Sequence, residues 1–252
     1  MQDAMQNGSS GRYSKTPLQK AAEYLQAKNY SQLARKVGGR IRAKVGTAIT
    51  PIVRRKLAGG HFIIGAKEYT YFISARNSTW ANERAVEISY AKEILKHVGP
   101  CDLMEIGNVL KNYLSGDWLV CDKYDSSPGI EQQDVLSLAI GRKFKRIISV
   151  STLEHVGFDE PCQKIDAFPL AMSRIAEHLE VGGEFHCTLP IGYNPIVDQH
   201  LRDGSVKFDK VIYLLRDGMT SWRMGSSREA HEQKYGHPYG CANALAICVV
   251  SG

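Results

Sequence analysis

The sequence predicts an α/β fold with a mainly parallel, doubly wound sheet covered by helices on both faces. Short apolar segments alternate with segments of helical spacing over residues 83–250. Each apolar segment is short enough to be a strand buried on both faces, as the strands of a parallel sheet are. Several of these segments end at a glycine or a carboxylate, and ligands bind at such strand ends in α/β sheets. Together these features indicate a small-molecule pocket.

Composition favours one substantial core and a reducing compartment. The chain has 252 residues, of which 43% are hydrophobic, which is enough for one domain and a small appendage. Its six cysteines are widely spaced and form no Cys-x-x-Cys pair, and Cys121, Cys187 and Cys248 lie in apolar, strand-like runs. There is no signal-peptide pattern and no run of about 18 apolar residues. We therefore expect a reduced, cytoplasmic protein.

The basic charge is confined to an N-terminal extension, residues 1–60. These residues carry twelve Lys and Arg against two acidic residues, whereas residues 61–252 carry 20 against 24. We expect residues 1–16 to be disordered and Pro17–Leu57 to form basic amphipathic helices. Such an arm either docks on its own domain or contacts an anionic membrane surface at its periphery. The extension shows no recognisable nucleic-acid-binding module, so we expect no nucleic-acid partner.

The remaining elements follow in order. Residues 59–80 are rich in glycine and aromatic residues and predict an extended lead-in, followed by a helix over Glu83–His97. A second helix is expected directly after Gly107, and a third over Ala167–Leu179, where glycines stop it. Strands are expected at Asp102–Gly107, Trp118–Cys121, Ile130–Leu136, Arg146–Ser151, Glu184–Leu189, Lys210–Leu215 and Ala244–Val250.

Polar residues collect at the ends of the first four strands. The first ends at Glu105-Ile-Gly107, where a glycine lets a ligand approach the backbone. Asp122 ends the second strand, and its carboxylate can accept both hydroxyls of a ribose or serve as a turn residue. Asp134 ends the third, where it can accept an adenine amino proton or cap a helix. The fourth ends at Ser151-Thr-Leu-Glu-His155, beside the far end of such a ligand.

The segment after Gly107 argues strongly against a nicotinamide dinucleotide. It reads Asn-Val-Leu-Lys and lacks the later glycines of a Gly-x-Gly-x-x-Gly fingerprint. A dinucleotide needs those glycines for close approach of its pyrophosphate and for helix packing. The expected ligand is therefore an adenosine without a pyrophosphate. Asn108 tolerates a left-handed backbone better than most residues do.

Residues 80–252 resemble the class I S-adenosylmethionine-dependent methyltransferases. The resemblance is closest in Asp102–Leu114, Trp118–Leu136, Phe144–Glu160 and Val181–Pro195. A bacterial branch associated with sugar and polysaccharide O-methylation looks similar in Asn82–Ile88, Val120–Tyr124, Ile148–Glu160 and Leu189–Pro195. The resemblance implies that residues 61–252 form a methyltransferase domain with a Rossmann-like, seven-stranded sheet whose last strand is antiparallel.

The same resemblance implies S-adenosylmethionine as cofactor and S-adenosylhomocysteine as product. It places the cofactor on residues of the four strand ends. These are Glu105, Gly107 and Asn108 for the methionine and ribose, Asp122 for the ribose hydroxyls, Lys123, Asp134 and Val135 for adenine, and Ser151 for a backbone contact.

His155 is the candidate general base, with Glu154 beside it. Imidazole titrates near neutrality, and His155 follows the fourth strand, close to where the methyl group would lie. The alternative is that His155 packs over the cofactor or caps the next helix. Glu154, Asp159 and Glu160 could join His155 around a divalent metal, but acids clustered at a helix start are commonly partners of its dipole. No metal is predicted.

The Gly- and Pro-punctuated segment 188–198 is expected to form a loop along the acceptor side. Tyr193, Asn194 and Asp198 would bind substrate, because sugars require flat faces and hydrogen-bond partners. Trp222 could extend this wall or lie in a solvent loop. The predicted function is O-methylation of a saccharide or glycan precursor. A small natural product, a nitrogen acceptor and a non-catalytic methyltransferase-like domain remain alternatives, and the oligomeric state is unknown.

Overall fold

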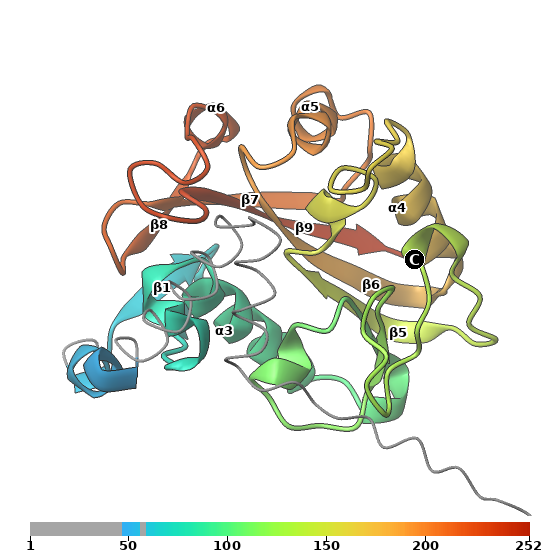
Figure 1. Ribbon diagram of the computed structural model, residues 1–252, viewed down its shortest axis with the longest axis horizontal. Coiled ribbons are helices and arrows are strands. Elements are labelled where there is room, and N and C mark those ends of the chain that lie inside the picture. The colour runs from blue at the N-terminus through green and yellow to red at the C-terminus, as the bar shows by residue number, and fades with distance from the viewer. Residues whose placement is uncertain (1–46, 56–58) are drawn as a thin grey trace, which may run out of the picture. The chain divides into compact units, whose positions relative to one another are not determined.

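A seven-stranded sheet in the order β4-β3-β5-β6-β9-β7-β8 lies at the centre of the computed structural model (Figure 1), which describes residues 47–55 and 59–252. Strand β3 pairs in parallel with β4 and β5, and β5 pairs in parallel with β6, whereas β9 is antiparallel to both β6 and β7. A mostly parallel sheet with an antiparallel last strand was predicted and is confirmed. Its strands are β3 (Leu103–Ile106), β4 (Leu119–Cys121), β5 (Phe144–Val150), β6 (Leu179–Pro190), β7 (Lys210–Arg216), β8 (Trp222–Gly225) and β9 (Ala244–Ser251).

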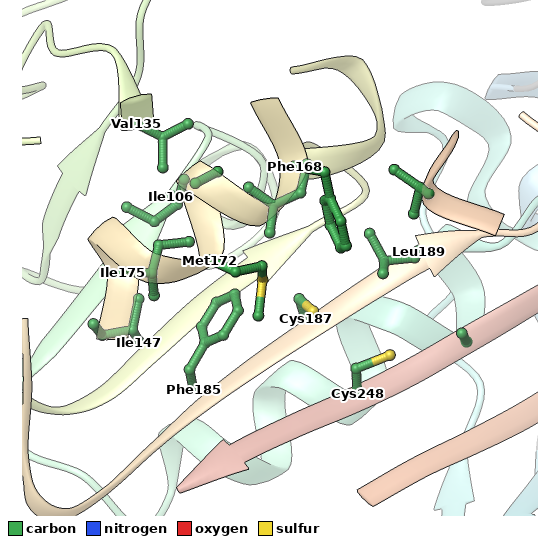
Figure 2. Packing of buried hydrophobic residues seen from close by; sticks show 14 of the residues in the cluster. Ile106, Val135, Ile147, Phe168, Met172, Ile175, Phe185, Cys187, Leu189 and Cys248 are labelled. Carbon is green, nitrogen blue, oxygen red and sulfur yellow. The ribbon is translucent and has the colours of Figure 1, made fainter. Parts of the chain in front are cut away.

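Helices cover both faces of the sheet. Side chains alternate between the faces along β6, so Phe185 and Cys187 point to one side and His186 to the other. Phe185 and Cys187 pack with α4 in the core shown in Figure 2. His186 instead contacts Tyr90 of α3, with 2.8 Å between the histidine Nδ1 and the tyrosine hydroxyl. The helices are α3 (Arg84–Leu95), α4 (Ala167–Glu177), α5 (Pro195–Asp203) and α6 (Ser227–His231).

The α4 core follows from helical spacing. Phe168, Met172 and Ile175 recur at steps of four and three, so they share one face of the helix and point at the sheet. Each is less than a tenth exposed. The predicted helix over Ala167–Leu179 is confirmed, although it ends at Glu177 and Leu179 already begins β6. The three cysteines of apolar runs are buried in the sheet as predicted.

Two predicted elements differ from the structure, and one strand was not predicted. The strand expected at Ile130–Leu136 is reduced to one bridge between Glu131 and Cys121, and Asp134 already caps a 3-10 turn. The helix expected after Gly107 is only a 3-10 turn, η3 (Leu110–Asn112). At the opposite edge, β8 supplies a seventh strand that the pattern did not indicate.

The lead-in at residues 59–80 contains an antiparallel hairpin of β1 (His61–Ile64) and β2 (Lys67–Thr70), followed by η1 (Arg76–Ala81). Residues 47–55 are helical and belong to the same unit, Gly46–Gly252. The indole N–H of Trp80 donates to the Thr50 hydroxyl over 3.3 Å. The rest of the predicted basic extension lies outside the described residues. No helix in the described part of the chain is long and apolar enough to cross a membrane.

Candidate active site

A cavity of about 360 Å³ opens at the carboxyl ends of β3, β4 and β5. Parallel strands deliver the residues that follow them to this edge, which is where such sheets bind ligands. Six of the eight predicted cofactor residues line the cavity, namely Gly107, Asp122, Lys123, Asp134, Val135 and Ser151, and His155 joins them. Glu105, Asn108 and Glu154 do not line it.

Gly107 forms the floor of the cavity at the end of β3. Its φ of 83° lies in the region that favours glycine, and its N–H donates to the Cys121 carbonyl oxygen over 2.8 Å. A Cβ atom at this position would lie 2.3 Å from Oγ1 of Thr152. Thr152, two residues after β5, therefore packs against the glycine turn, and no larger side chain fits at Gly107. The positive φ belongs to Gly107 and not to Asn108.

Glu105 holds the glycine turn from behind instead of contacting a ligand, which corrects the predicted role. Its Oε1 accepts the N–H groups of Val109 over 2.8 Å and Leu110 over 2.6 Å. Its Oε2 accepts the indole N–H of Trp118 over 2.8 Å. The carboxyl is fully buried, and burial raises its pKa to about 7 despite these three hydrogen bonds. These hydrogen bonds hold the backbone that leads into the 3-10 turn η3.

Replacing Glu105 by Gln is expected to destabilise the protein much more at low pH than at high pH. A carboxyl pKa raised on folding contributes stability that is complete below the unfolded pKa and is lost as pH rises through the folded pKa, here about 7. The amide N–H₂ group of Gln would also face one of the N–H donors that now bond to the carboxyl. This mismatch lowers the free energy of unfolding by about 1–3 kcal/mol. Between about pH 4 and about pH 8 the destabilisation should shrink by roughly 3 kcal/mol. Urea unfolding at both pH values measures it, and a pH-independent difference would contradict the expectation.

Asp122 organises the turn after β4 and still faces the cavity. Its Oδ1 accepts the N–H groups of Tyr124 over 2.8 Å and Asp125 over 2.9 Å. Its Oδ2 accepts the N–H of Asn108 over 3.0 Å, which leaves that oxygen one acceptor position for a ligand. The side-chain N–H₂ of Asn108 donates to the Asp125 carboxylate over 2.7 Å. The predicted cofactor role of Asn108 is therefore indirect, through Asp122.

Lys123 and Asp134 form an ion pair at the cavity wall. The lysine Nζ lies 2.9 Å from Asp134 Oδ2 and also pairs with Glu160. These two carboxylates raise the pKa of Lys123. Burial alone would raise the pKa of Asp134, but the Leu136 N–H and Lys123 outweigh burial and lower it. Asp134 caps the 3-10 helix η4 (Val135–Ser137) and also lines the cavity. Its side chain therefore occupies both positions that the sequence offered as alternatives.

Ser151 directly follows β5 and has a strained backbone conformation, with a φ of 38°. Such a residue costs on the order of 1–3 kcal/mol and persists only when its surroundings hold it. Its N–H donates to the Thr188 carbonyl oxygen over 3.1 Å, and its hydroxyl donates to Glu87 Oε1 over 2.5 Å. The Thr188 hydroxyl donates to the same carboxylate oxygen over 2.7 Å. Glu87 of α3, which sequence reasoning missed, therefore fixes this part of the cavity wall.

His155 ends the 3-10 helix η5 (Leu153–His155) and is oriented by a carboxylate. Its Nδ1 lies 2.6 Å from Asp159 Oδ2, and the Tyr193 hydroxyl donates to that same oxygen over 2.7 Å. The Tyr193 ring packs edge-on against the imidazole with 4.7 Å between centroids. A carboxylate at Nδ1 fixes the proton there and leaves Nε2 as the basic nitrogen. Asp159 was named from the sequence only as one of several nearby acids, and the spacing of four residues is the signal that could have indicated this pair.

The acidic residues near His155 each have different partners. Glu154 turns into the protein with 2% exposure, and its Oε1 lies 3.5 Å from His155 Nε2. Asp159 holds His155, and Glu160 pairs with Lys123. Within the described residues, no group of three or more His, Cys, Asp or Glu side chains could hold a metal ion.

The predicted substrate residues divide in two. None of the three lines the cavity, but the Tyr193 ring packs against His155, which does. Asn194 caps α5 by accepting the Ile196 N–H over 2.9 Å, and buried Asp198 accepts the Gly192 N–H over 2.9 Å. The segment predicted as an acceptor loop thus consists of the end of β6, a short turn over residues 191–194 and the first turn of α5, and these two side chains stabilise the turn and the helix start. Trp222 lies in β8 with 5% exposure, so it belongs to the core.

Comparisons with known proteins give distant structural similarities. No family model and no curated protein sequence matches the chain. The N-methyltransferase NodS from Bradyrhizobium japonicum WM9 is 10% identical over 68% of this chain and 87% of its own, with a TM-score of 0.43. A S-adenosylmethionine-dependent methyltransferase from Clostridium acetobutylicum ATCC 824 is 14% identical over 66% and 89%, with a TM-score of 0.37. The sugar N-methyltransferase KedS8 from Streptoalloteichus sp ATCC 53650 is 12% identical over 67% and 88%, with a TM-score of 0.35.

Similarities at this level do not indicate what this chain binds. All three neighbours are methyltransferases by description. What supports the proposal below is the chain's own strand order and the residues that surround the cavity.

Proposed function

We propose that the protein is an S-adenosylmethionine-dependent methyltransferase. The observation that supports this best is the convergence of Gly107, Asp122 and Asp134 on one cavity of about 360 Å³. An adenosine needs three things from its site. Gly107 gives a backbone that the ligand can approach, Asp122 gives an acceptor for the ribose, and Asp134 gives an acceptor for the adenine edge. The cavity volume is within the usual range for small-molecule sites. The tight contact between Gly107 and Thr152 leaves no broad glycine loop for a pyrophosphate.

The residues present fit this cofactor. Asp122 would accept a ribose hydroxyl on its Oδ2, and the backbone at Gly107 would meet the methionine part. Asp134 would accept the adenine amino group, with Lys123 neutralising its charge. Val135, which is buried at the cavity wall, would pack against the ring. When bound, the cofactor supplies an electrophilic methyl group on a sulfonium.

The proposed acceptor is a hydroxyl group of a saccharide, and His155 is its general base. Nε2 of His155 takes the hydroxyl proton as the oxygen attacks, while Asp159 holds the other ring nitrogen. Asp159 is about half exposed, at 47%, so the proton can pass on to solvent. The Tyr193 ring beside His155 offers a flat face of the kind that sugars stack on.

Replacing His155 by Ala is expected to reduce kcat by about 10²–10⁴-fold, the usual contribution of a general base, with unchanged affinity for S-adenosylhomocysteine. Asp159→Asn should reduce kcat by a smaller factor, because it removes the charge that orients His155 but keeps the base itself. Release of S-adenosylhomocysteine with a panel of hexoses, hexosamines and alkyl glycosides measures kcat, and calorimetry measures the affinity. His200→Ala, which removes a partly exposed histidine that bonds to Ser205 and stacks on Phe168 away from the cavity, is the matched control. Full activity of the His155 variant would exclude the base role.

A further inference from the structure

An ion pair joins two walls of the cavity that come from different strands. Lys123 lies two residues after β4, and Glu160 lies on the segment that follows β5 and η5. In the sheet order β3 separates β4 from β5, so the two segments leave strands that are about 10 Å apart. The Lys123 Nζ nevertheless pairs with Oε1 of Glu160. The ion pair therefore reaches across the end of β3, where Gly107 forms the cavity floor.

This ion pair lies at the border between the cavity and solvent. Lys123, Tyr124 and Glu160 all line the cavity. The side chains of Lys123 and Glu160 are nevertheless 35% and 19% exposed, and Tyr124 is 74% exposed. The Tyr124 hydroxyl donates to the same Glu160 oxygen over 3.3 Å, and Lys123 Nζ lies 5.3 Å from the centre of the Tyr124 ring. These three side chains, which we call the strap, thus separate part of the cavity from water.

The β4 end of the strap has further attachments of its own. Oδ1 of Asp122 accepts the N–H of Tyr124 over 2.8 Å, which holds the backbone of the turn. The Lys123 Nζ lies 2.9 Å from Oδ2 of Asp134, so the lysine keeps a carboxylate partner without Glu160. Both β4 residues of the strap are therefore held in place independently of their contact with Glu160.

The Glu160 end lies on a short loop, residues 158–163, which forms no helix or strand. Phe158 and Asp159 attach the beginning of this loop to Tyr193, through a ring contact of 5.9 Å between centroids and a hydrogen bond of 2.7 Å. The side chain of Glu160 comes next and contacts the β4 residues of the strap. The loop residues after it are exposed. The strap is therefore the attachment that holds the middle of the loop against the cavity.

We infer that Glu160 is a positioning residue that controls entry and release of the cofactor. This inference rests on the proposed function, because it concerns the same cavity. Glu160 acts through Lys123: their ion pair holds the strap over the side of the cavity proposed for adenine, and its loss frees the loop to move outward. A cavity of about 360 Å³ exists with the strap closed, so a ligand can lie beneath the intact ion pair. The ion pair must then open for entry and for exit alike.

Binding rates distinguish this role from a direct contact with the ligand. Glu160→Gln keeps the shape of the side chain and removes its charge. Surface plasmon resonance on the full-length protein is expected to show S-adenosylhomocysteine associating and dissociating about fivefold faster, the upper range for a partly exposed ion pair. Because both rate constants rise together, Kd should change by less than about twofold. Glu177→Gln, which changes a carboxylate paired with Arg174 away from the cavity, is the matched control and should leave both rates unchanged.

A double-mutant cycle shows whether Glu160 acts through Lys123. In a Lys123→Met background the ion pair is already absent, so adding Glu160→Gln should change either rate by less than about twofold. Tyr124→Phe is a second variant that leaves the core intact, because it removes only the hydroxyl of an exposed ring. It should raise both rates in the same direction as Glu160→Gln, and to a smaller extent.

Each outcome decides one question. Unchanged rates in Glu160→Gln, or a fivefold effect that persists in the Lys123→Met background, would overturn the positioning role. A weaker Kd with an unchanged association rate would overturn it too, because Glu160 would then contact the ligand directly. Failure of the wild type to bind S-adenosylhomocysteine would overturn the proposed function itself, whereas binding at rates that do not depend on Glu160 would overturn the strap alone.

Discussion

Replacing Gly107 by Ala is expected to destabilise the protein by about 3 kcal/mol or more and to abolish binding of S-adenosylhomocysteine. The backbone cost of a non-glycine residue at a φ of 83° is roughly 1–2 kcal/mol. The added Cβ would also lie 2.3 Å from Thr152 Oγ1 and 2.6 Å from its methyl carbon, and overpacking of this kind costs roughly 1–3 kcal/mol. Relief of the contact displaces the turn that forms the cavity floor. Urea unfolding and calorimetry measure the two effects.

Gly129 provides the matched control for this experiment. Its φ of 84° is almost the same, but a Cβ there would meet nothing within 4 Å. Gly129→Ala therefore measures the backbone cost alone, and the difference between the two variants measures the contact with Thr152. Adding Thr152→Ala to Gly107→Ala should recover about 1 kcal/mol, because two of the three close contacts disappear. Equal destabilisation by Gly107→Ala and Gly129→Ala would show that the contact has no effect.

Replacing Asp122 by Ala is expected to weaken S-adenosylhomocysteine binding by about 100-fold or more. The change removes the acceptor proposed for the ribose, and a lost hydrogen bond to a charged group costs roughly 1.5–3 kcal/mol. It also leaves the N–H groups of Asn108, Tyr124 and Asp125 without their acceptor, so the turn beside the cavity loosens. Calorimetry with S-adenosylhomocysteine measures the loss.

Asp125→Ala is the control for loosening of the turn. Asp125 accepts hydrogen bonds from Asn108 and Ser127 but does not line the cavity. Its replacement should change the affinity only a few-fold. Unchanged binding in Asp122→Ala would instead favour a methyltransferase-like domain that uses this edge for another partner.

The sheet could be predicted largely from the sequence, because its strands are apolar runs that alternate with helices. The absence of the predicted third strand could not be foreseen. Ile130–Leu136 has β-like residues but forms only the Glu131 bridge before Asp134 starts a 3-10 turn. Edge strand β8 was also missed, because its four residues, Trp222–Gly225, are too few for a period to show. Short edge elements are stabilised by tertiary contacts, which a single sequence does not reveal.

In the candidate site, the sequence identified residues by their chemistry but not by their partners. Asp122 and Asp134 face the cavity, as their positions at strand ends indicated. Glu105 and Asn194 are also polar, but their side-chain oxygens accept hydrogen bonds from nearby N–H groups instead of facing the cavity. Glu87 meets Ser151 only because α3 packs across β5 and β6, a contact between residues 64 positions apart. Long-range placement of this kind is set by packing and not by local pattern.

The hydrogen bond between Trp118 and Glu105 also has a spectroscopic consequence. The indole N–H donates to the same carboxyl group that holds the turn after Gly107, and the ring has Lys111 Nζ 4.7 Å from its centroid. Indole emission responds to a nearby carboxyl changing its charge or position. Trp118 is 6% exposed, so bulk quenchers reach it poorly. Trp118 therefore lies one hydrogen bond behind the turn at Gly107, and we expect its emission to respond when a ligand moves that turn.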